Sequence, residues 1–204
     1  MTDRLPPGQV LTAKWPVLHY GLVPEVDTAT WTFEVSGLVE RPFSITWGEL
    51  CALPRHTVRC DIHCVTTWSR FDNAFEGVAV RLLLERAGVS PAARYCLVHA
   101  EQDFTTNLPL VDLDRPDNLV AVKHDGDWLT PEHGGPARLL VPHLYFWKSA
   151  KWVRGFELLG HDIPGFWEQN GYHMRGDPWT EERYGGRAIT QHEINRLRNR
   201  SKRP

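Results

Sequence analysis

Residues 59–70 read RCDIHCVTTWSR and place two thiols and an imidazole close together, at Cys60, His63 and Cys64. Thiolate and imidazole are ligands of structural zinc, and they also form nucleophilic Cys–His pairs. The preceding residues 57–62 predict a strand, which would deliver His63 and Cys64 at its end. This stretch therefore leaves three interpretations open: a metal site, a nucleophilic pair, or buried thiols at a strand end.

The composition describes a chain of ordinary size with little net charge. Its 204 residues suit one large domain or two small ones, and a formal net charge of −2 gives no indication of nucleic-acid binding. No apolar run approaches the roughly 18 residues that a membrane span needs. The first residues show no export signal, so we expect a cytoplasmic protein whose four cysteines are reduced.

Apolar periodicity predicts more strands than helices. The expected strands cover residues 31–38, 57–62, 95–100, 118–123, 137–142 and 152–159. The few helices do not alternate regularly with these strands, which favours an α+β fold with mixed or antiparallel sheets over a doubly wound fold. We expect a single domain over residues 1–204, with an irregular wrap over residues 160–187 that is rich in Gly, Pro and Trp.

Helices are indicated at three places. Thr46 and Glu49 match a capping box that opens a short helix, and an apolar stripe predicts a second helix over residues 78–88. A second capping box, Thr190 with Glu193, predicts a terminal helix over about residues 190–199.

A second stretch, residues 133–152, reads HGGPARLLVPHLYFWKSAKW and has the composition of an anion site. Two glycines before a proline let backbone N–H groups approach a ligand, and Arg138 follows with a planar fork suited to phosphate oxygens. Lys148, Ser149 and Lys151 add two ammonium groups and a hydroxyl among aromatic side chains. The alternative is a surface turn with solvated lysines. The spacing is not that of a P-loop.

A soft-metal thiolate and a phosphate site together indicate a cofactor that has both a metal and a phosphate tail. Molybdopterin is such a cofactor, because its dithiolene sulfurs hold molybdenum and a phosphate ends the pterin.

With these motifs the chain resembles the molybdopterin-binding domain of the sulfite oxidase superfamily. It is most similar to the small members and to the catalytic subunit of the bacterial protein-methionine-sulfoxide reductase. The stretches that carry the resemblance are WPVLHYGLVP, DIHCVTTWSRFDNAFEGV, TTNLPL, HGGPARLLVPHLYFWKSAKW, GFWEQNGYH and GDPWTEERY. They extend over nearly the whole chain, and their combination is specific.

The resemblance implies roles for single positions. The cysteine of the family's Cys-Val-x-x-Trp stretch ligates molybdenum, and here it is Cys64. Arg138 takes the place of a phosphate or pterin contact, and Lys151 binds the phosphate. The other implied cofactor contacts are His19, Tyr20, Ala100, Asn107, His133, Ser149 and Ala150, with Thr106 beside Asn107 in the same cleft. Arg70, just beyond Trp68, is expected to face the pocket and attract the substrate.

The expected function is molybdenum-dependent oxygen-atom transfer on a small substrate, with electrons exchanged with a separate partner protein. The Gly-Asn-Arg run that typically follows the metal cysteine in true sulfite oxidases is missing. Reduction of an S-oxide or N-oxide is therefore favoured over sulfite oxidation. Two alternatives remain: a module that holds molybdopterin without turnover, and a zinc-dependent hydrolase in which His56 or Asp61 completes the CDIHC ligand set.

Overall fold

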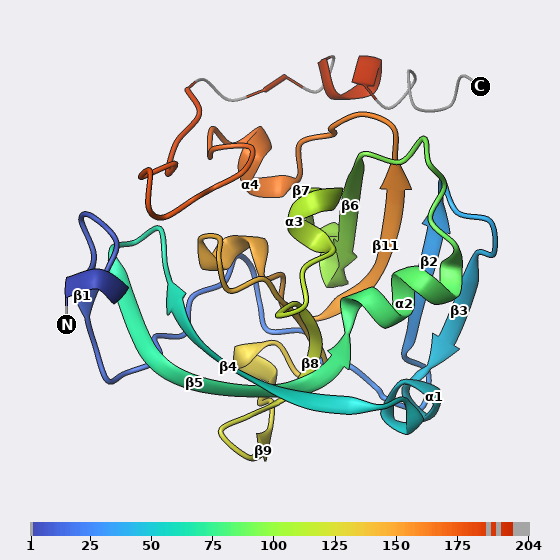
Figure 1. The fold of residues 1–204 in the computed structure, drawn as a ribbon, viewed down its shortest axis with the longest axis horizontal. Coiled ribbons are helices and arrows are strands. Elements are labelled where there is room, and N and C mark those ends of the chain that lie inside the picture. The colour runs from blue at the N-terminus through green and yellow to red at the C-terminus, as the bar shows by residue number, and fades with distance from the viewer. Residues whose placement is uncertain (1, 187–188, 191–192, 198–204) are drawn as a thin grey trace.

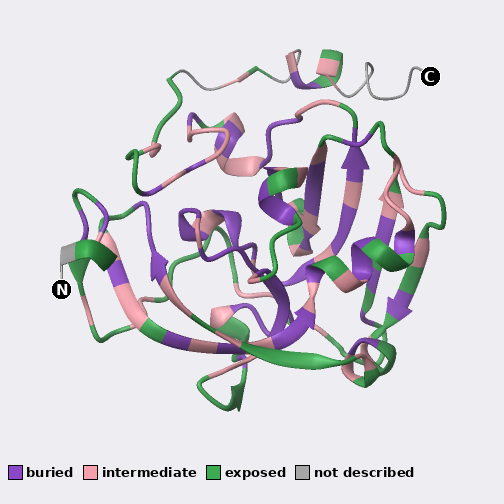
Figure 2. Ribbon diagram, viewed as in Figure 1, coloured by how far each residue is buried: buried purple, intermediate pink, exposed green. Residues whose placement is uncertain are grey.

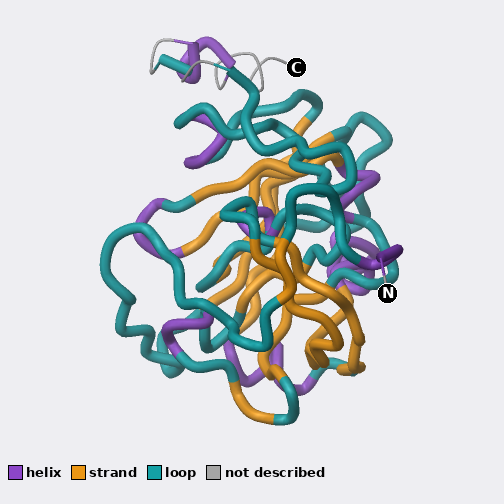
Figure 3. Tube along the Cα trace, turned by 90° about the vertical axis from the view of Figure 1, so that its left-hand side faces the viewer, coloured by secondary structure: helices purple, strands orange, loops and turns teal. Residues whose placement is uncertain are grey.

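Two β-sheets form the centre of the molecule, and short helices and long loops connect their strands (Figures 1 and 3). The computed structural model describes residues 2–186, 189–190 and 193–197. The six-stranded sheet, sheet A, contains β1 (Val10–Leu11), β4 (Arg55–His63), β5 (Trp68–Ala79), β8 (Leu119–His124), β9 (Asp127–Trp128) and β10 (Arg138–Leu140). The five-stranded sheet, sheet B, has the order β3 (Phe43–Thr46), β2 (Thr32–Gly37), β11 (Val153–Leu159), β6 (Tyr95–Ala100) and β7 (Thr105–Pro109).

The helices are short and connect the strands. The α-helices are α1 (Trp47–Ala52), α2 (Val80–Ala87), α3 (Leu110–Leu113) and α4 (Phe166–Gln169). The 3₁₀ turns are η1 (Thr2–Arg4), η2 (Glu101–Asp103), η3 (Pro131–His133) and η4 (Phe146–Lys148). The α+β fold with mixed sheets is confirmed, since both sheets contain parallel and antiparallel pairs.

Local sequence signals place several elements correctly. β6 covers the predicted residues, and α1 begins at its capping box, in which the Glu49 carboxylate accepts from the Thr46 N–H at 2.7 Å. Helix α2 begins later than predicted, because Val78 still belongs to β5. It ends at Gly88, whose φ of 66° is a left-handed conformation that glycine adopts without strain.

The central strand β8 is buried on both faces, which explains its continuous apolar run. Leu119 and Ala121 pack into one cluster, together with Phe75 and Phe146. The alternate residues of β8 face the main core between the two sheets. Figure 2 shows the buried residues along the strands of both sheets, while β9 and the first half of β4 are exposed.

The longest strand, β5, is not predicted by the sequence. Its 12 residues pair with β1, β4 and β8, but the register shifts opposite Cys60–Ile62 and again between Glu76 and Gly77. These irregularities interrupt the alternation of apolar and polar residues by which a strand is detected. The short strand β7 was missed as well, since its sequence TTNLP has no clear alternation.

The end of the chain is mostly irregular. Within the described residues after Gly160, α4 and the Tyr172–Tyr184 bridge precede a helical segment at residues 193–197. The Thr190–Glu193 capping box forms, with 2.9 Å from the Thr190 N to the Glu193 carboxylate. Residues 191–192 and 198–199 of the predicted helix lie outside the described residues. No helix in the described part of the chain is long and apolar enough to cross a membrane.

The close approach of β8 to Gly77 gives the first testable prediction. A Cβ atom at Gly77 would overlap the Val120 carbonyl oxygen and lie 2.6 Å from the Ala121 Cα. We expect Gly77→Ala to lower the free energy of unfolding, measured by urea denaturation, by about 1–3 kcal/mol. Gly48→Ala is the control, since nothing lies within 4 Å of its Cβ position in α1. It should raise the same free energy by about 0.5–1 kcal/mol, and equal effects of the two changes would contradict the packing described.

Candidate functional site

Cys64 begins the tight turn, residues 64–67, that joins β4 to β5. Its N–H donates to the Trp68 carbonyl oxygen at 2.8 Å, and its own carbonyl accepts from the Thr67 N–H at 3.0 Å. The Cys64 Sγ lies 3.1 Å from the Thr66 Oγ1. Because the side chain is buried, the pKa of the thiol is raised above its ordinary value. A bound metal cation is the charge that would hold this sulfur as a thiolate.

The neighbouring metal-ligand candidates do not join Cys64. Cys60 packs against the cluster that contains Ile62 and Phe75, and burial raises the pKa of its thiol to about 12. His63 Nδ1 lies 2.8 Å from the Ser69 Oγ, and burial lowers the pKa of its ring to about 4. In the part of the chain that the structure describes, no three His, Cys, Asp or Glu residues gather as a metal site would require. The zinc-hydrolase alternative therefore gains no support.

A cavity of about 340 Å³ opens beside Cys64. Seven of the eleven predicted site residues line it, from four separate parts of the chain: His19, Tyr20, Cys64, Arg138, Ser149, Ala150 and Lys151. Cys64 of the first motif therefore lines the same cavity as Arg138 and Lys151 of the second motif, which lie more than 70 residues later in the sequence.

Arg138 is a buried cation without a carboxylate partner among the described residues. It is 1% exposed, and its Nη1 and Nη2 donate to the carbonyl oxygens of His133 and Ser149, each at 2.8 Å. Its Nε has no partner, and the guanidinium lies 4.1 Å from the centre of the Phe146 ring. Burial lowers the pKa of Arg138 to about 9. Strand alternation forces this placement, because Arg138 shares a face of β10 with Leu140 of the cluster below the cavity.

Lys151 supplies a second cation to the cavity. Its Nζ donates to the Glu132 carbonyl oxygen, and the side chain lies against the cavity beside Ser149 and Ala150. Burial and, next, the charge of Arg138 lower the pKa of Lys151 to about 7. Two like charges in a partly dry wall favour a bound anion, which would neutralise both.

Aromatic side chains form most of the remaining wall, and sequence reasoning did not assign them individually. They are Trp15, Trp68, Phe104, Phe146, Trp147, Trp152, Phe166, Trp167 and Tyr172. Trp147 packs edge-on against Tyr172 with ring centres 5.2 Å apart, and Tyr172 stacks on Trp167 at 4.9 Å. The only signal in the sequence was the heavy load of nine tryptophans.

Four predicted site residues do not line the cavity. Arg70 pairs with Asp125 at 2.9 Å, hydrogen-bonds to Asn73 and lies 2.9 Å from the His124 Nε2, so its guanidinium is held away from the expected pocket position. His133 lies behind Trp15, with ring centres 3.9 Å apart, and so supports the wall rather than forming it.

Asn107 and Ala100 are structural in this arrangement. Asn107 Nδ2 donates to the Asp162 carboxylate at 2.7 Å, and the Asn107 Oδ1 accepts from Lys148. Its neighbour Thr106 donates to Glu168 instead of lining the cleft. Ala100 packs in the main core.

The glycine loop does not form the expected anion cradle. The N–H groups of Gly134 and Gly135 donate to the carbonyl oxygens of Pro131 and Thr130, at 3.1 and 2.9 Å. Both donors are therefore engaged within the chain, and neither glycine lines the cavity. The positive φ of 102° at Gly134 instead lets the backbone pass close to Lys151, whose Cα would be 3.0 Å from a Cβ there.

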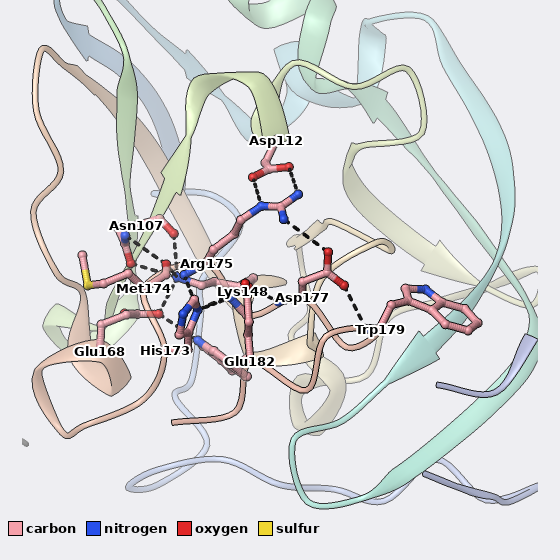
Figure 4. Close-up of polar contacts among 12 residues, drawn as sticks. Asn107, Asp112, Lys148, Glu168, His173, Met174, Arg175, Asp177, Trp179 and Glu182 are labelled. Atoms are coloured by element: carbon pink, nitrogen blue, oxygen red, sulfur yellow. Dashed lines mark hydrogen bonds and ion pairs between the residues drawn. The ribbon is translucent and has the colours of Figure 1, made fainter. Parts of the chain in front are cut away.

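Lys148 does not line the cavity, contrary to the expectation that it adds to the anion site. Figure 4 shows it beside Asn107, Glu168 and Met174. Its side chain is fully buried and forms a 2.6 Å ion pair with Glu168. The Nζ also donates to the Asn107 Oδ1 at 2.8 Å and to the Met174 carbonyl oxygen at 2.7 Å. Glu168 in turn accepts from the Trp147 Nε1 at 2.7 Å. The ion pair therefore connects α4 to η4, the turn that carries Trp147.

A second polar network lies beside this pair (Figure 4). Arg175 forms two hydrogen bonds with Asp112, at 2.8 and 3.2 Å, and one with Asp177 at 3.2 Å. Burial raises the pKa of Asp112, but hydrogen bonds from His143 and Arg175 outweigh it and leave the pKa below its ordinary range. This network attaches the irregular C-terminal segment to α3.

Comparisons with known proteins agree with the fold and identify a family. The family model of the oxidoreductase molybdopterin binding domain matches residues 20–167. The "Uncharacterized oxidoreductase YuiH" of Bacillus subtilis (strain 168) is 50% identical over 184 residues, which cover 90% of this chain and 93% of that protein. The "Putative protein-methionine-sulfoxide reductase subunit YedZ1" of Azospira oryzae is 29% identical over 173 residues, covering 83% of this chain and 66% of that subunit.

Two more distant matches are longer proteins. The NADH nitrate reductase of Volvox carteri is 27% identical over 169 residues, and these cover 67% of this chain and 20% of the enzyme. The solved structure of the sulfane dehydrogenase SoxCD from Paracoccus pantotrophus superposes with a TM-score of 0.65 and 23% identity, over 78% of this chain and 46% of that one. At this identity the likeness supports the fold.

An α+β fold in which a buried thiol and a buried cation without a described carboxylate partner face one cavity is typical of a protein that binds an anionic metal cofactor. The chain belongs to the family with an oxidoreductase molybdopterin binding domain, and the resemblance to the sulfite oxidase superfamily is confirmed. Its cofactor is molybdopterin with molybdenum.

The cavity fits this cofactor. The Nε of Arg138 has no partner, and together with Lys151 it suits the phosphate of the cofactor. The Cys64 thiol lines the same cavity and is a soft ligand that suits the metal. The flat aromatic walls suit a planar ring system between them.

The buried pair Lys148–Glu168 gives the second prediction. Glu168→Gln leaves the Lys148 ammonium buried without a counter-charge, so we expect the free energy of unfolding of the apoprotein to fall by about 3–5 kcal/mol. Urea denaturation measures this change. Asp114→Asn, which breaks the nearly half-exposed pair with Arg81, is the matched control and should have a far smaller effect. An equal loss of unfolding free energy in both variants would contradict the larger contribution expected of the buried pair.

Proposed function

We propose that the chain reduces an S-oxide or N-oxide by oxygen-atom transfer, with Cys64 as the protein ligand of molybdenum. One observation carries the proposal: Cys64, Arg138 and Lys151 line the same cavity of about 340 Å³. When bound, the cofactor supplies a two-electron metal couple that exchanges an oxygen atom with the substrate. The work of the protein is to bind, orient and enclose it.

Arg138 and Lys151 anchor the phosphate end of the cofactor in this proposal. The Nε of the guanidinium is the donor that has no partner and is proposed to bind a phosphate oxygen, while Lys151 adds its ammonium at the same cavity. Ser149 and Ala150 directly precede Lys151 and line the same cavity. Arg138 is fixed before the anion binds, because the His133 and Ser149 carbonyls hold its two Nη groups.

His19 and Tyr20 close the cavity on the side of the N-terminal segment. The Tyr20 ring packs 4.7 Å from Phe166, and the His19 ring packs 6.0 Å from Trp152. We propose that both contact the pterin or the substrate entrance.

The aromatic wall supports a neutral oxide as substrate. No arginine or lysine other than Arg138 and Lys151 lines the cavity within the described residues, so an anion such as sulfite would find no cation of its own. The relative YedZ1, whose name is "Putative protein-methionine-sulfoxide reductase subunit", agrees with an S-oxide.

The electrons are proposed to come from a separate redox protein. The relative YedZ1 is named as a subunit, which agrees with a partner protein that supplies the electrons. A cytoplasmic location stays a prediction from the sequence.

The ligand role of Cys64 is tested against a matched cysteine. Mutations of groups that only support a metal ligand cost about 10–100-fold, so Cys64→Ser should lower reductase activity at least about 100-fold while circular dichroism stays unchanged. Cys60→Ser should leave the activity per bound molybdenum near that of the wild type, since Cys60 packs outside the cavity. Equal losses in the two variants would contradict a single-cysteine site.

The substrate class is tested with reduced viologen dye as the electron donor. Purified holoenzyme is offered a panel of neutral S-oxides and N-oxides, and sulfite is offered separately with an electron acceptor. We expect oxidation of the dye by at least one neutral oxide, with little turnover of sulfite. Turnover of sulfite alone would reject the proposed direction, and metal that is reduced but never reoxidised by any oxide would favour a carrier.

A further inference from the structure

The turn that carries Cys64 is held by the N-terminal segment. Gln9 is 7% exposed, and its Nε2 donates to the Cys64 carbonyl oxygen at 3.0 Å. The Gln9 Oε1 accepts from the Ser69 Oγ at 3.2 Å, so the amide joins the Cys64 turn to the start of β5. Next to it, the Val10 N–H donates to the Thr67 carbonyl oxygen at 2.8 Å. Both ends of the turn are thus bonded to the same short segment.

The C-terminal segment holds the same turn through Arg183. Its Nη1 donates to the Val65 carbonyl oxygen at 2.6 Å, and its Nη2 donates to the Pro7 carbonyl oxygen at 3.3 Å. The guanidinium also lies 5.0 Å from the centre of the Tyr145 ring, which packs in one cluster with Cys64 and Val65. Arg183 therefore connects the C-terminal segment to the N-terminal segment and to Val65, the residue directly after Cys64.

Neither residue belongs to the stretch that the family model matches, which covers residues 20–167. Cys64 lies within the matched stretch, whereas Gln9 and Arg183 lie outside it and hold the turn that carries Cys64. The charge of Arg183 adds to the geometry, since a cation near a partly dry site stabilises a negatively charged sulfur. The nearest carboxylate recorded for Arg183, that of Glu181, lies 3.9 Å away with half of its side chain exposed, so it leaves most of this charge uncompensated.

We propose that Gln9 and Arg183 are positioning residues that hold Cys64 in place for molybdenum and so determine how firmly the cofactor is retained. This inference rests on the proposed ligand role of Cys64. Neither side chain lines the cavity, so each acts through the Cys64 turn. Groups of this kind around a metal site orient its ligand and commonly change metal affinity by about 10–100-fold.

The test measures the release of molybdenum and pterin from purified holoenzyme during dilution, with thermal unfolding of each apoprotein as a check on the fold. Arg183→Met and Gln9→Met should each release the cofactor about 10-fold faster than the wild type. Arg183→Lys keeps the positive charge but loses the planar guanidinium, so its rate of cofactor release should lie between those of the wild type and Arg183→Met. Arg94→Met is the matched control, because Arg94 also donates to backbone carbonyls, those of Pro91 and Ala93, away from the cavity. It should release the cofactor at the wild-type rate.

A double-mutant cycle separates positioning from general stability. Once Cys64→Ser has removed the ligand, Arg183→Met should increase the release rate less than about twofold, since the residue acts through Cys64. A full tenfold effect in the Cys64→Ser background would overturn the inference, because Arg183 would then act on the fold. Wild-type release rates in both Arg183→Met and Gln9→Met would also overturn it. Gln9→Met decides the question where Arg183→Met does not fold.

The same set of variants tests the positioning role of Gln9 and Arg183 separately from the ligand role of Cys64. Release from Cys64→Ser at the wild-type rate would show that Cys64 is not the ligand, and the proposed function would fall with the inference. Faster release from Cys64→Ser, together with unchanged release from Arg183→Met and Gln9→Met, would overturn the positioning role alone.

Discussion

The functional site depends on the buried charge of Arg138. Removing a cation from water costs several kcal/mol even after the protein relaxes, unless a partner compensates it. Two backbone carbonyls and the Phe146 ring compensate part of this cost, but the Nε has no partner and no described carboxylate is near. A fold that retains such a charge in a cavity wall is suited to an anionic ligand. In the proposed function, Arg138 on β10 would hold that anion and Cys64 would bind the opposite end of the same ligand.

The contrast between Arg138 and Lys148 shows why sequence could not resolve the site fully. Both cations lie in one stretch of 20 residues and look alike as candidates for phosphate binding. Lys148 is neutralised by Glu168, which lies 20 positions further along on the short helix α4, and no local pattern reveals that pairing. A buried cation that already has a carboxylate serves the fold, whereas one without it is available to a ligand. The motifs make Cys64, Arg138 and Lys151 candidates, but only the tertiary structure shows that they line one cavity.

The fold was predictable where burial follows a regular period. β2 has clear alternation, β6 is a short and largely buried run, and a capping box begins α1, so local sequence suffices there. β5 was missed because two register shifts break its alternation, although it pairs with three other strands. The positions of Arg70 and Asn107 were beyond reach for another reason. Each is set by a partner at least 50 residues away, Asp125 and Asp162, that sequence alone does not associate with it.

The distribution of cations also constrains the chemistry of the substrate. A second anion that entered the cavity beside a bound phosphate would have to share Arg138 and Lys151 or remain uncompensated against aromatic walls. Arg70, the remaining candidate, is neutralised by Asp125, and moving its guanidinium into the cavity would leave that carboxylate unpaired. In the proposed function a neutral oxide avoids both costs, because its apolar part would pack against the aromatic rings and its oxygen would face the metal. The balance of charge in the wall therefore favours oxide reduction over the oxidation of an anion such as sulfite.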